Sequence, residues 1–297
     1  MRSAAALALL LLAPAVQAQT PVAGHYPPGQ SGIRGGASPA PGWNFINFNR
    51  AFSNLEVKDG DGETTAKRSE TRYANITMIM WTSERKVLGM DYGWAMGIPF
   101  ATGDLQASGD QDASFGLGDV LFTPLCLYAR RPAWDYQFQF TVWTPSGHFE
   151  PGSSSNRGTG YWALVYSAGA AWYPGEERKR WSLSAIARIE QNFEQKDTGI
   201  TPGDDLVIDW GVGRVLGERW DVGVSGFATW QLSEQQRGDP ALDTTPYRYY
   251  GAGPEGSLTL SPRLALRLRA QWEFGVRNAV AGNNLWFIAS WRGDRHP

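Results

Sequence analysis

Ser146 and His148 are the residues of this chain whose types and spacing come nearest to a hydrolytic pair. One residue separates them, so both side chains would lie on the same face of an extended strand end. A serine nucleophile needs a base within hydrogen-bond reach and a third group that orients the base. Glu150 and Asn156 could fill the third role, but neither has a telling spacing. Because polar residues often meet by chance in loops rich in Gly and Ser, we expect a turn here and no catalytic residues.

The sequence offers few residues for a metal site, a phosphate-binding loop or a nucleic-acid interface. The three histidines are His25, His148 and His296, and the single cysteine is Cys126. They are too few for a metal cluster, and one cysteine excludes an internal disulfide. The Gly-Leu-Gly run at 116–118 lacks the rest of a phosphate-loop pattern. The net charge of −2 gives no broad basic face for nucleic acid. We therefore expect no metal, no cofactor and no nucleic-acid partner.

Charged residues elsewhere point to a different kind of site. They fall in or beside stretches in which alternate residues are apolar. These residues are Asp91, Asp119, Arg188, Glu190, Glu194, Asp209, Glu255, Arg267, Arg269 and Glu273. Their chemistry would be electrostatic: they could pair with one another or bind a solute. Which of the two they do depends on the elements that position them.

Those elements are strands with two different faces. From Leu88 to Phe100 every second residue is large and apolar, and the residues between are small or polar. This period of two is typical of a strand and not of a helix. The pattern recurs at 134–142, 162–172, 181–190 (where Ile186 is an exception), 205–212, 220–230 and 264–274, and more weakly at 43–58, 69–82, 115–129, 247–260 and 284–292. The sequence therefore predicts about twelve strands, an even number as in bacterial single-chain barrels.

The composition separates a membrane barrel from a soluble one. The chain has 14 Trp, 11 Tyr and 13 Phe, yet its mean hydropathy is −0.35. An outer-membrane barrel needs aromatic girdles and an apolar outer band around a polar lumen, which accounts for this mixture. A soluble β-sandwich or soluble barrel would not need so many aromatic residues. After the N-terminus no stretch approaches the length of a helical membrane span. We therefore predict an all-β, single antiparallel transmembrane barrel over residues 43–292, located in the outer membrane.

The connections between strands alternate in length. Long ones are expected near 59–68, 102–114, 145–160, 195–203, 233–246 and 277–283, and short ones near 83–86, 130–133, 174–180, 217–219 and 261–262. Outer-membrane barrels have long extracellular loops and short periplasmic turns, so both termini would be periplasmic. The last strand ends in the aromatic Trp291, a signal of the kind that outer-membrane assembly machinery recognises. Residues 293–297 would be a short periplasmic tail.

The N-terminal 42 residues fall into two parts. Residues 1–18 have a positive start at Arg2, a short apolar run and small residues before a cleavage site between Ala18 and Gln19. They predict a signal peptide that is removed on export. Residues 19–42 are rich in Pro and Gly and cannot form a regular strand. They would be either a flexible periplasmic tail or a plug that folds into the lumen, and the sequence leaves both open.

The lumen is the candidate site. Charge at membrane depth is costly unless it faces water or a partner, so the charged residues named above should line the interior. They would form a paired ionic network, a path for a solute, or both. Their mixed signs predict no strong preference for cations or anions. A twelve-stranded lumen is wider than one that side chains fill completely and narrower than that of a large porin, which suits a guarded path for a small solute.

Several motifs resemble the outer-membrane barrel family named for the meta-pathway of phenol degradation. They are the Tyr/Pro/Gly stretch at 24–42 that leads into Trp43, a Gly-x-Gly-Asp…Pro pattern at 116–124, a Pro-Ser-Gly-His-Phe-Glu turn at 145–150 and a Gly-Pro-Glu run at 253–255. Ser146 and Phe149 depart from the family's turn, where Thr and Tyr are usual. The likeness covers most of residues 24–291 and explains Ser146 and His148 as part of a turn.

What the resemblance implies is uptake of small hydrophobic compounds, aromatic ones among them, across the outer membrane. The partners would be the lipid bilayer, the assembly machinery and a small-molecule solute. Two alternatives of other classes stay open. One is a lipid-modifying barrel enzyme similar to an outer-membrane phospholipase, with Ser146 and His148 at its rim. The other is a structural or adhesive barrel whose extracellular loops bind partners.

Overall fold

The computed structural model describes residues 24–69, 71–102, 115–153, 155–175, 180–237 and 245–293. The expected signal peptide at 1–18, its cleavage site at Ala18 and Gln19, and the tail after residue 293 lie outside these residues. The described part of the chain forms strands, turns and irregular segments. It contains no helix that is long and apolar enough to cross a membrane.

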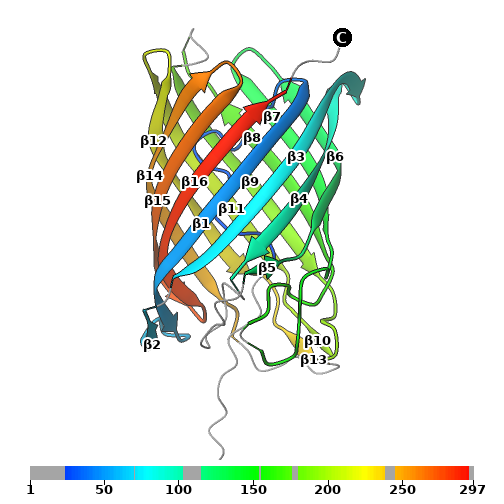
Figure 1. Ribbon diagram of the computed structural model, residues 1–297, viewed down its shortest axis with the longest axis vertical. Helices are drawn as coiled ribbons and strands as arrows, with labels where there is room; N and C mark the ends of the chain where they lie inside the picture. Colours follow the sequence, from blue (N-terminus) through cyan, green and yellow to red (C-terminus); the bar gives the residue numbers. More distant parts are fainter. Residues whose placement is uncertain are drawn as a thin grey trace, which may run out of the picture.

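Within the described ranges, twelve antiparallel strands close into a barrel (Figure 1). Each strand pairs with its neighbours in chain order, and the last pairs with the first from Asn44–Arg292 to Val57–Val280. This closure leaves no unpaired edge among the twelve and confirms the predicted fold class. The barrel strands are β1 (Gly42–Lys58), β3 (Arg72–Val87), β4 (Met90–Ala101), β6 (Leu121–Arg130), β7 (Trp134–Trp143), β8 (Ala163–Trp172), β9 (Trp181–Asn192), β11 (Asp205–Leu216), β12 (Trp220–Gln231), β14 (Arg248–Ser261), β15 (Leu264–Arg277) and β16 (Val280–Arg292).

The two ends of the barrel differ. Four short strands gather at one end, the lower end in Figure 1: β2 (Thr64–Arg68), β5 (Gly116–Leu117), β10 (Ile200–Thr201) and β13 (Gln236–Arg237). We call this the loop end; it holds the connections after β1, β4, β7, β9, β12 and β15. The opposite end, which we call the turn end, holds the connections after β3, β6, β8, β11 and β14. By the rule for outer-membrane barrels, the loop end is extracellular and the turn end periplasmic.

The alternation in the sequence corresponds to the two faces of the wall. Along β9 the even-numbered residues from Ser182 to Asn192 are buried, and most of the odd-numbered residues are exposed. Large apolar side chains are exposed on the outside, among them Trp134, Phe138 and Trp172. So much exposed apolar surface would be a liability in water and is the lipid-facing surface of a membrane barrel. Ile186, the exception in the pattern, is 3% exposed because it faces the interior.

Two connections differ from the sequence prediction. The predicted turn at 83–86 lies inside β3, and the true turn is Leu88–Gly89, where both residues have positive φ, 52° and 76°. Such a two-residue hairpin turn suits the twist of its strands, and the polar residues before it extend the hairpin past the bilayer. The predicted long connection at 277–283 is also wrong: β15 ends at Arg277 and β16 begins at Val280. Asn278, with φ 51°, makes this turn, so the alternation of long and short connections does not hold at the last hairpin.

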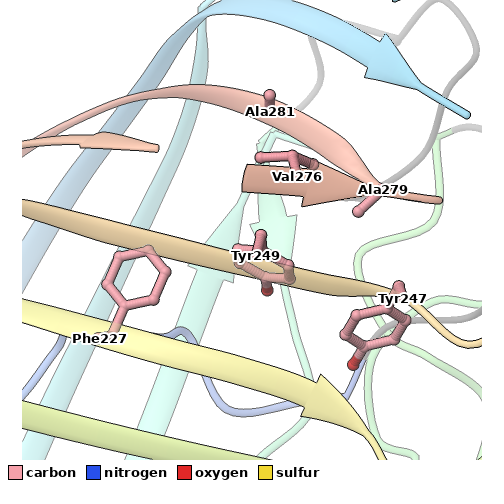
Figure 2. Packing of buried hydrophobic residues seen from close by; sticks show 6 residues of the cluster. All are labelled: Phe227, Tyr247, Tyr249, Val276, Ala279 and Ala281. Atoms are coloured by element: carbon pink, nitrogen blue, oxygen red, sulfur yellow. The ribbon is translucent and has the colours of Figure 1, made fainter. Parts of the chain in front are cut away.

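Buried side chains occupy the interior near the loop end. One cluster consists of Phe227, Tyr247, Tyr249, Val276, Ala279 and Ala281 (Figure 2). These residues come from β12, β14, β15, β16 and the segments beside them. Phe52, Leu55 and Val280 form a second cluster where β1 meets β16. Side chains therefore pack the interior near the loop end on this side of the barrel.

Candidate functional site

Residues 24–41, which we call the inner segment, run through the interior of the barrel (Figure 1, dark blue). At the loop end the backbone N–H of His25 donates to Glu190 Oε1 at 2.7 Å. At the turn end the N–H of Ser38 donates to Asp135 Oδ2 at 3.2 Å. The chain then leaves the lumen at Gly42 and enters β1. Residues 24–41 thus lie inside the ring of strands.

The inner segment has no sheet or helix of its own to satisfy its backbone donors. Buried N–H groups need acceptors, and here the wall supplies them as carboxylates. Asp209 accepts from the N–H groups of Gly29 at 2.8 Å and Ser31 at 3.1 Å. Glu255 accepts from the N–H of Ile33 at 3.1 Å. Asp209 and Glu255, which the sequence indicated as lumen residues, therefore bind the inner segment as well as basic residues of the wall.

At the loop end, the side chain of His25 contacts two carboxylates and a hydroxyl group of the barrel. Its Nδ1 lies 2.8 Å from Glu190 Oε1, and its Nε2 lies 2.6 Å from Thr159 Oγ1 and 3.4 Å from Asp119 Oδ2. Its ring stacks on Trp143 with the ring centres 5.2 Å apart. Burial by itself lowers the pKa of His25, but the bonds to the two carboxylates outweigh it and raise the pKa to about 9. His25 is thus a buried cation at neutral pH.

Asp119 connects the inner segment to the loop between β7 and β8. Its carboxylate accepts from the N–H of Gly147 at 2.8 Å and from the N–H of Thr159 at 2.6 Å. Burial tends to raise the pKa of Asp119, but His25 and these donors hold it below its usual value. Asp119 lies between β5 and β6 and not on the predicted strand at 115–129, because β6 begins only at Leu121.

Tyr26 and Arg188 form the next contact towards the turn end. The Tyr26 hydroxyl donates to Asp209 Oδ2 at 2.6 Å. Arg188 lies over the Tyr26 ring at 4.1 Å, pairs with Asp209 at 3.3 Å and donates to Ser31 Oγ at 2.7 Å. A planar guanidinium can stack and donate at the same time, which a lysine could not do here.

Glu255 is shared by two arginines of β15. Arg269 Nε donates to Glu255 Oε2 at 2.7 Å, and Arg267 Nε lies 3.2 Å from Glu255 Oε1. Arg269 also donates to the carbonyl of Gly29. Gly32, with φ 71°, passes so close that a side chain there would overlap Glu255 and Arg269. The group carries two positive charges and one negative charge.

At the turn end the contacts continue to the mouth of the lumen. Arg34 pairs with Asp221 of β12. Gln137 Nε2 donates to the carbonyl of Gly35 at 2.7 Å, and Arg130 donates to the carbonyl of Ser38 at 2.9 Å. The inner segment is therefore fixed to the wall along its whole length.

A second buried charge cluster has no bond to the inner segment among the described contacts. Glu273 accepts from Asn284 Nδ2 at 2.8 Å and from the N–H of Gly282 at 3.0 Å. Arg50 donates to Asn284 Oδ1 at 2.6 Å and lies 3.9 Å from Glu273. Sequence reasoning proposed Glu273 but missed Arg50. The feature that could have indicated Arg50 is its position between Phe48 and Phe52, two inward positions of the same alternating strand.

Two of the proposed lumen residues lie elsewhere. Asp91 pairs with Lys86 in the hairpin at the turn end, away from the segment. Glu194, beyond the end of β9, is exposed near the loop end. Arg188, Glu190, Asp209, Glu255, Arg267, Arg269 and Glu273 belong to the interior groups described above. His25, Arg34, Asp135 and Asp221 were missed, the first two because their segment has no periodicity that would show where they point.

A cavity of about 520 Å³ lies between the inner segment and the opposite wall. Its lining includes Ser261, Pro262 and Arg263 at the turn end and stops at the level of Trp143 and Arg188. Buried residues such as Tyr161 and Ala163 pack near this level. The lining of the cavity therefore extends from the periplasmic side to the residues around His25.

Ser146 and His148 do not form a hydrolytic pair. Ser146 Oγ accepts from the N–H of Val120 at 2.8 Å, which fixes the turn. His148 lies 3.6 Å from Glu150 and is half exposed. In the described part of this loop no hydrogen bond joins the two side chains. The side chain of Asn156 bonds the backbone of Glu150 and orients no base.

Comparison with known proteins identifies the family. The sequence model described as "Putative MetA-pathway of phenol degradation" matches residues 56–288. The chain belongs to this family. No curated protein matches the chain.

Solved structures with a similar fold include the COG4313 outer membrane channel from Pseudomonas putida F1. It has a TM-score of 0.69 and 14% identity over 90% of this chain and 99% of that chain. The CymD monoaromatic hydrocarbon channel has a TM-score of 0.45 and 10% identity over 86% of this chain and 90% of its own. The deltaS2 mutant of the TodX monoaromatic hydrocarbon channel has a TM-score of 0.42 and 11% identity over 87% and 91%. The first of these supports the barrel fold of this member of the phenol-degradation family; the other two are too distant for argument.

Proposed function

We propose that this barrel is an outer-membrane channel for the uptake of small hydrophobic compounds, aromatic ones among them, and that the inner segment closes it. The observation that carries the proposal is the cavity of about 520 Å³, which reaches the periplasmic end and stops where His25 and its neighbours fill the lumen. A volume of this size suits one small organic molecule.

The family and its neighbours support this choice of function. The description of the family refers to phenol degradation, a pathway whose substrates must first cross the outer membrane. The similar barrel from Pseudomonas putida F1 is called an outer membrane channel. The absence of a bond between Ser146 and His148 in the described loop favours a channel over a lipid-modifying enzyme. In this proposal the assembly machinery recognises β16, which ends in an amphipathic stretch with Trp291.

Passage through the channel requires part of the inner segment to move. The residues from Gly24 to Ser31 bond the wall at Glu190 and Asp209, at the level where the cavity stops. These bonds join side chains to backbone groups across an interior that water could enter, so water can replace them without breaking the barrel. The loop-end half of the segment is therefore the part expected to open.

Conductance tests this proposal. Purified full-length protein and a variant lacking residues 24–41 are inserted into planar bilayers and into liposomes that report arabinose uptake by swelling. We expect small, intermittent conductance from the full-length protein and larger, continuous conductance from the variant. Circular dichroism and the mobility shift of heated samples on gels show that each barrel is folded. Absence of current and of arabinose uptake in both folded proteins would reject the channel function.

A further inference from the structure

The charged residues that line the cavity carry one sign. Within the described residues the lining includes five arginines and no Asp or Glu; the arginines are Arg34, Arg188, Arg263, Arg267 and Arg292. The acidic residues that the sequence indicated for the lumen are not part of this lining. Arg263 and Arg292 lie at the periplasmic mouth, Arg267 lies deeper, and Arg188 lies at the inner end. Arginine side chains therefore line the cavity from its mouth to its end.

The inner segment is the reason for this difference. The carboxylates of Asp209 and Glu255 bind backbone N–H groups of the segment and are turned away from open space. Their side chains are 1% and 0% exposed, whereas the paired side chains of Arg188 and Arg267 are 10% and 25% exposed. Each pair therefore presents its positive member to the cavity. Near Glu255 the charges do not cancel, because Arg267 and Arg269 share a single carboxylate.

Apolar side chains also line the cavity, next to polar ones such as Gln137 and Gln139. The apolar ones include Ile46 and Phe48 of β1, Met78 and Met80 of β3, and Leu121 of β6. In the closed ring of strands, β1 lies across from β9, which holds Arg188, whereas only β16 separates β1 from β15, which holds Arg267. Methionine and phenylalanine side chains adapt to flat apolar bodies and contact aromatic rings favourably. The cavity thus brings arginine and apolar side chains together.

We infer that the cavity binds an organic anion with an apolar, aromatic body, such as an aromatic carboxylate or sulfonate. The anionic group would bond the guanidinium of Arg267, which has donors in a fork that fits a carboxylate. The ring would lie on Phe48 and Met78. Neutral hydrocarbons would contact only the apolar side chains, and aromatic cations would be repelled by the arginines. This inference rests on the proposed channel function and specifies its substrate class.

Equilibrium binding tests the inference without requiring transport. The probes are benzenesulfonate and phenyltrimethylammonium, two aromatic ions of similar size that stay charged at all relevant pH values. Isothermal titration calorimetry on the full-length protein in detergent at low salt gives both affinities. We expect benzenesulfonate to bind about tenfold or more tightly than phenyltrimethylammonium, since one probe gains the Coulomb energy that the other loses. Equal affinities, or tighter binding of the cation, would overturn the inference.

Two arginine variants locate the site. Arg267→Gln keeps the Arg269–Glu255 pair, so the lumen is not left with an unpaired carboxylate. It should weaken benzenesulfonate binding about fivefold, the effect of losing one water-screened contact with a unit charge. Arg219→Gln removes an equal charge from the exposed β11–β12 turn, outside the cavity lining, and should change nothing. Equal effects of the two variants, or no effect of Arg267→Gln, would reject the cavity as the site.

The outcome is separable from that of the channel proposal. Reversal potentials with potassium benzenesulfonate on both sides at different concentrations measure whether the same anion passes through the open channel. Binding that follows the pattern above without any current would support the anion site and reject transport. Arabinose uptake without preference for benzenesulfonate would support the channel and reject the anion site.

Discussion

The imidazole of His25 lies between the carboxylates of Glu190 and Asp119, with Nδ1 at 2.8 Å from the first and Nε2 at 3.4 Å from the second. Glu190 belongs to β9 of the barrel wall. Asp119 belongs to the connection between β5 and β6, and its carboxylate also bonds Gly147 in the extracellular loop after β7. One cation thus joins three parts of the molecule: the inner segment, the wall and an extracellular loop. Because this contact lies at the closed end of the cavity, its strength should determine how readily the channel opens.

Raising the pH should open the channel. In the released segment His25 has its ordinary pKa of 6.5, and docking raises the pKa to about 9. Protonated His25 therefore stabilises the docked segment fully below pH 6.5, and this stabilisation is lost as the pH rises through about 9. Its size is on the order of 3 kcal/mol, since each pKa unit corresponds to about 1.4 kcal/mol. Open probability in planar bilayers should be higher at pH 10 than at pH 6.

A substitution at His25 separates this effect from general effects of pH. His25→Gln keeps a donor in place but cannot titrate, so its open probability should be higher at pH 6 and should not change up to pH 10. His148→Gln alters the half-exposed loop histidine and should behave as the wild type. If the wild type and His25→Gln show the same pH profile, His25 does not hold the closed state.

Loss of Arg269 should destabilise the whole barrel. This side chain is 0% exposed and bonds both Glu255 and the carbonyl of Gly29. Arg269→Met leaves Glu255 with Arg267, which is partly exposed, and leaves the Gly29 carbonyl without its donor. Removing one partner of a buried pair costs about 3–5 kcal/mol. Arg277→Met, on the exposed end of the same strand, should cost less than about 1 kcal/mol. Urea unfolding of both variants in detergent measures the difference, and equal losses would contradict the role given to Arg269.

Gly36 should tolerate no side chain. A Cβ atom at this position would overlap the carbonyl of Ala170 on β8. Gly36→Ala should therefore push the inner segment from the wall and lower the free energy of unfolding by about 1–3 kcal/mol, as overpacking generally does. The matched control is Gly256→Ala on β14, where nothing lies within 4 Å of the added atom. An unchanged unfolding midpoint for Gly36→Ala would show that the segment is not packed against β8.

The sequence could predict the barrel because lipid outside and water inside impose a period of two on every strand. It could not predict where strands end beyond the bilayer, since both faces meet water there. For this reason the polar stretch at 83–86 resembled a turn and the small residues at 277–283 resembled a loop. Asn47 and Asn49, on the outer face of β1, weakened the alternation that would have drawn attention to Arg50.

The charged residues of the wall could be predicted, but their partners could not. Glu190, Asp209 and Glu255 stand out because a charge interrupts an apolar pattern at membrane depth. The groups that they bind are backbone N–H groups and His25 of a segment whose sequence carries no periodicity. Since such donors exist in every chain, no residue type reveals them. The sign of the cavity depends on these bonds and therefore could only be read from the structure.

Deleting residues 24–41 should change the ion selectivity of the channel towards cations. The deletion removes the cations His25 and Arg34 and frees the carboxylates of Glu190, Asp209 and Glu255 from the segment's N–H groups. In the full-length protein these carboxylates are withdrawn from the cavity; in the variant they would face a water-filled lumen. We expect the potassium-to-chloride permeability ratio, from reversal potentials in a KCl gradient, to rise from below one to above one. Adding Glu190→Gln and Asp209→Asn to the deletion should return the ratio towards anions. A deletion variant that is as anion-selective as the full-length protein would show that the inner segment does not set the charge of the lumen.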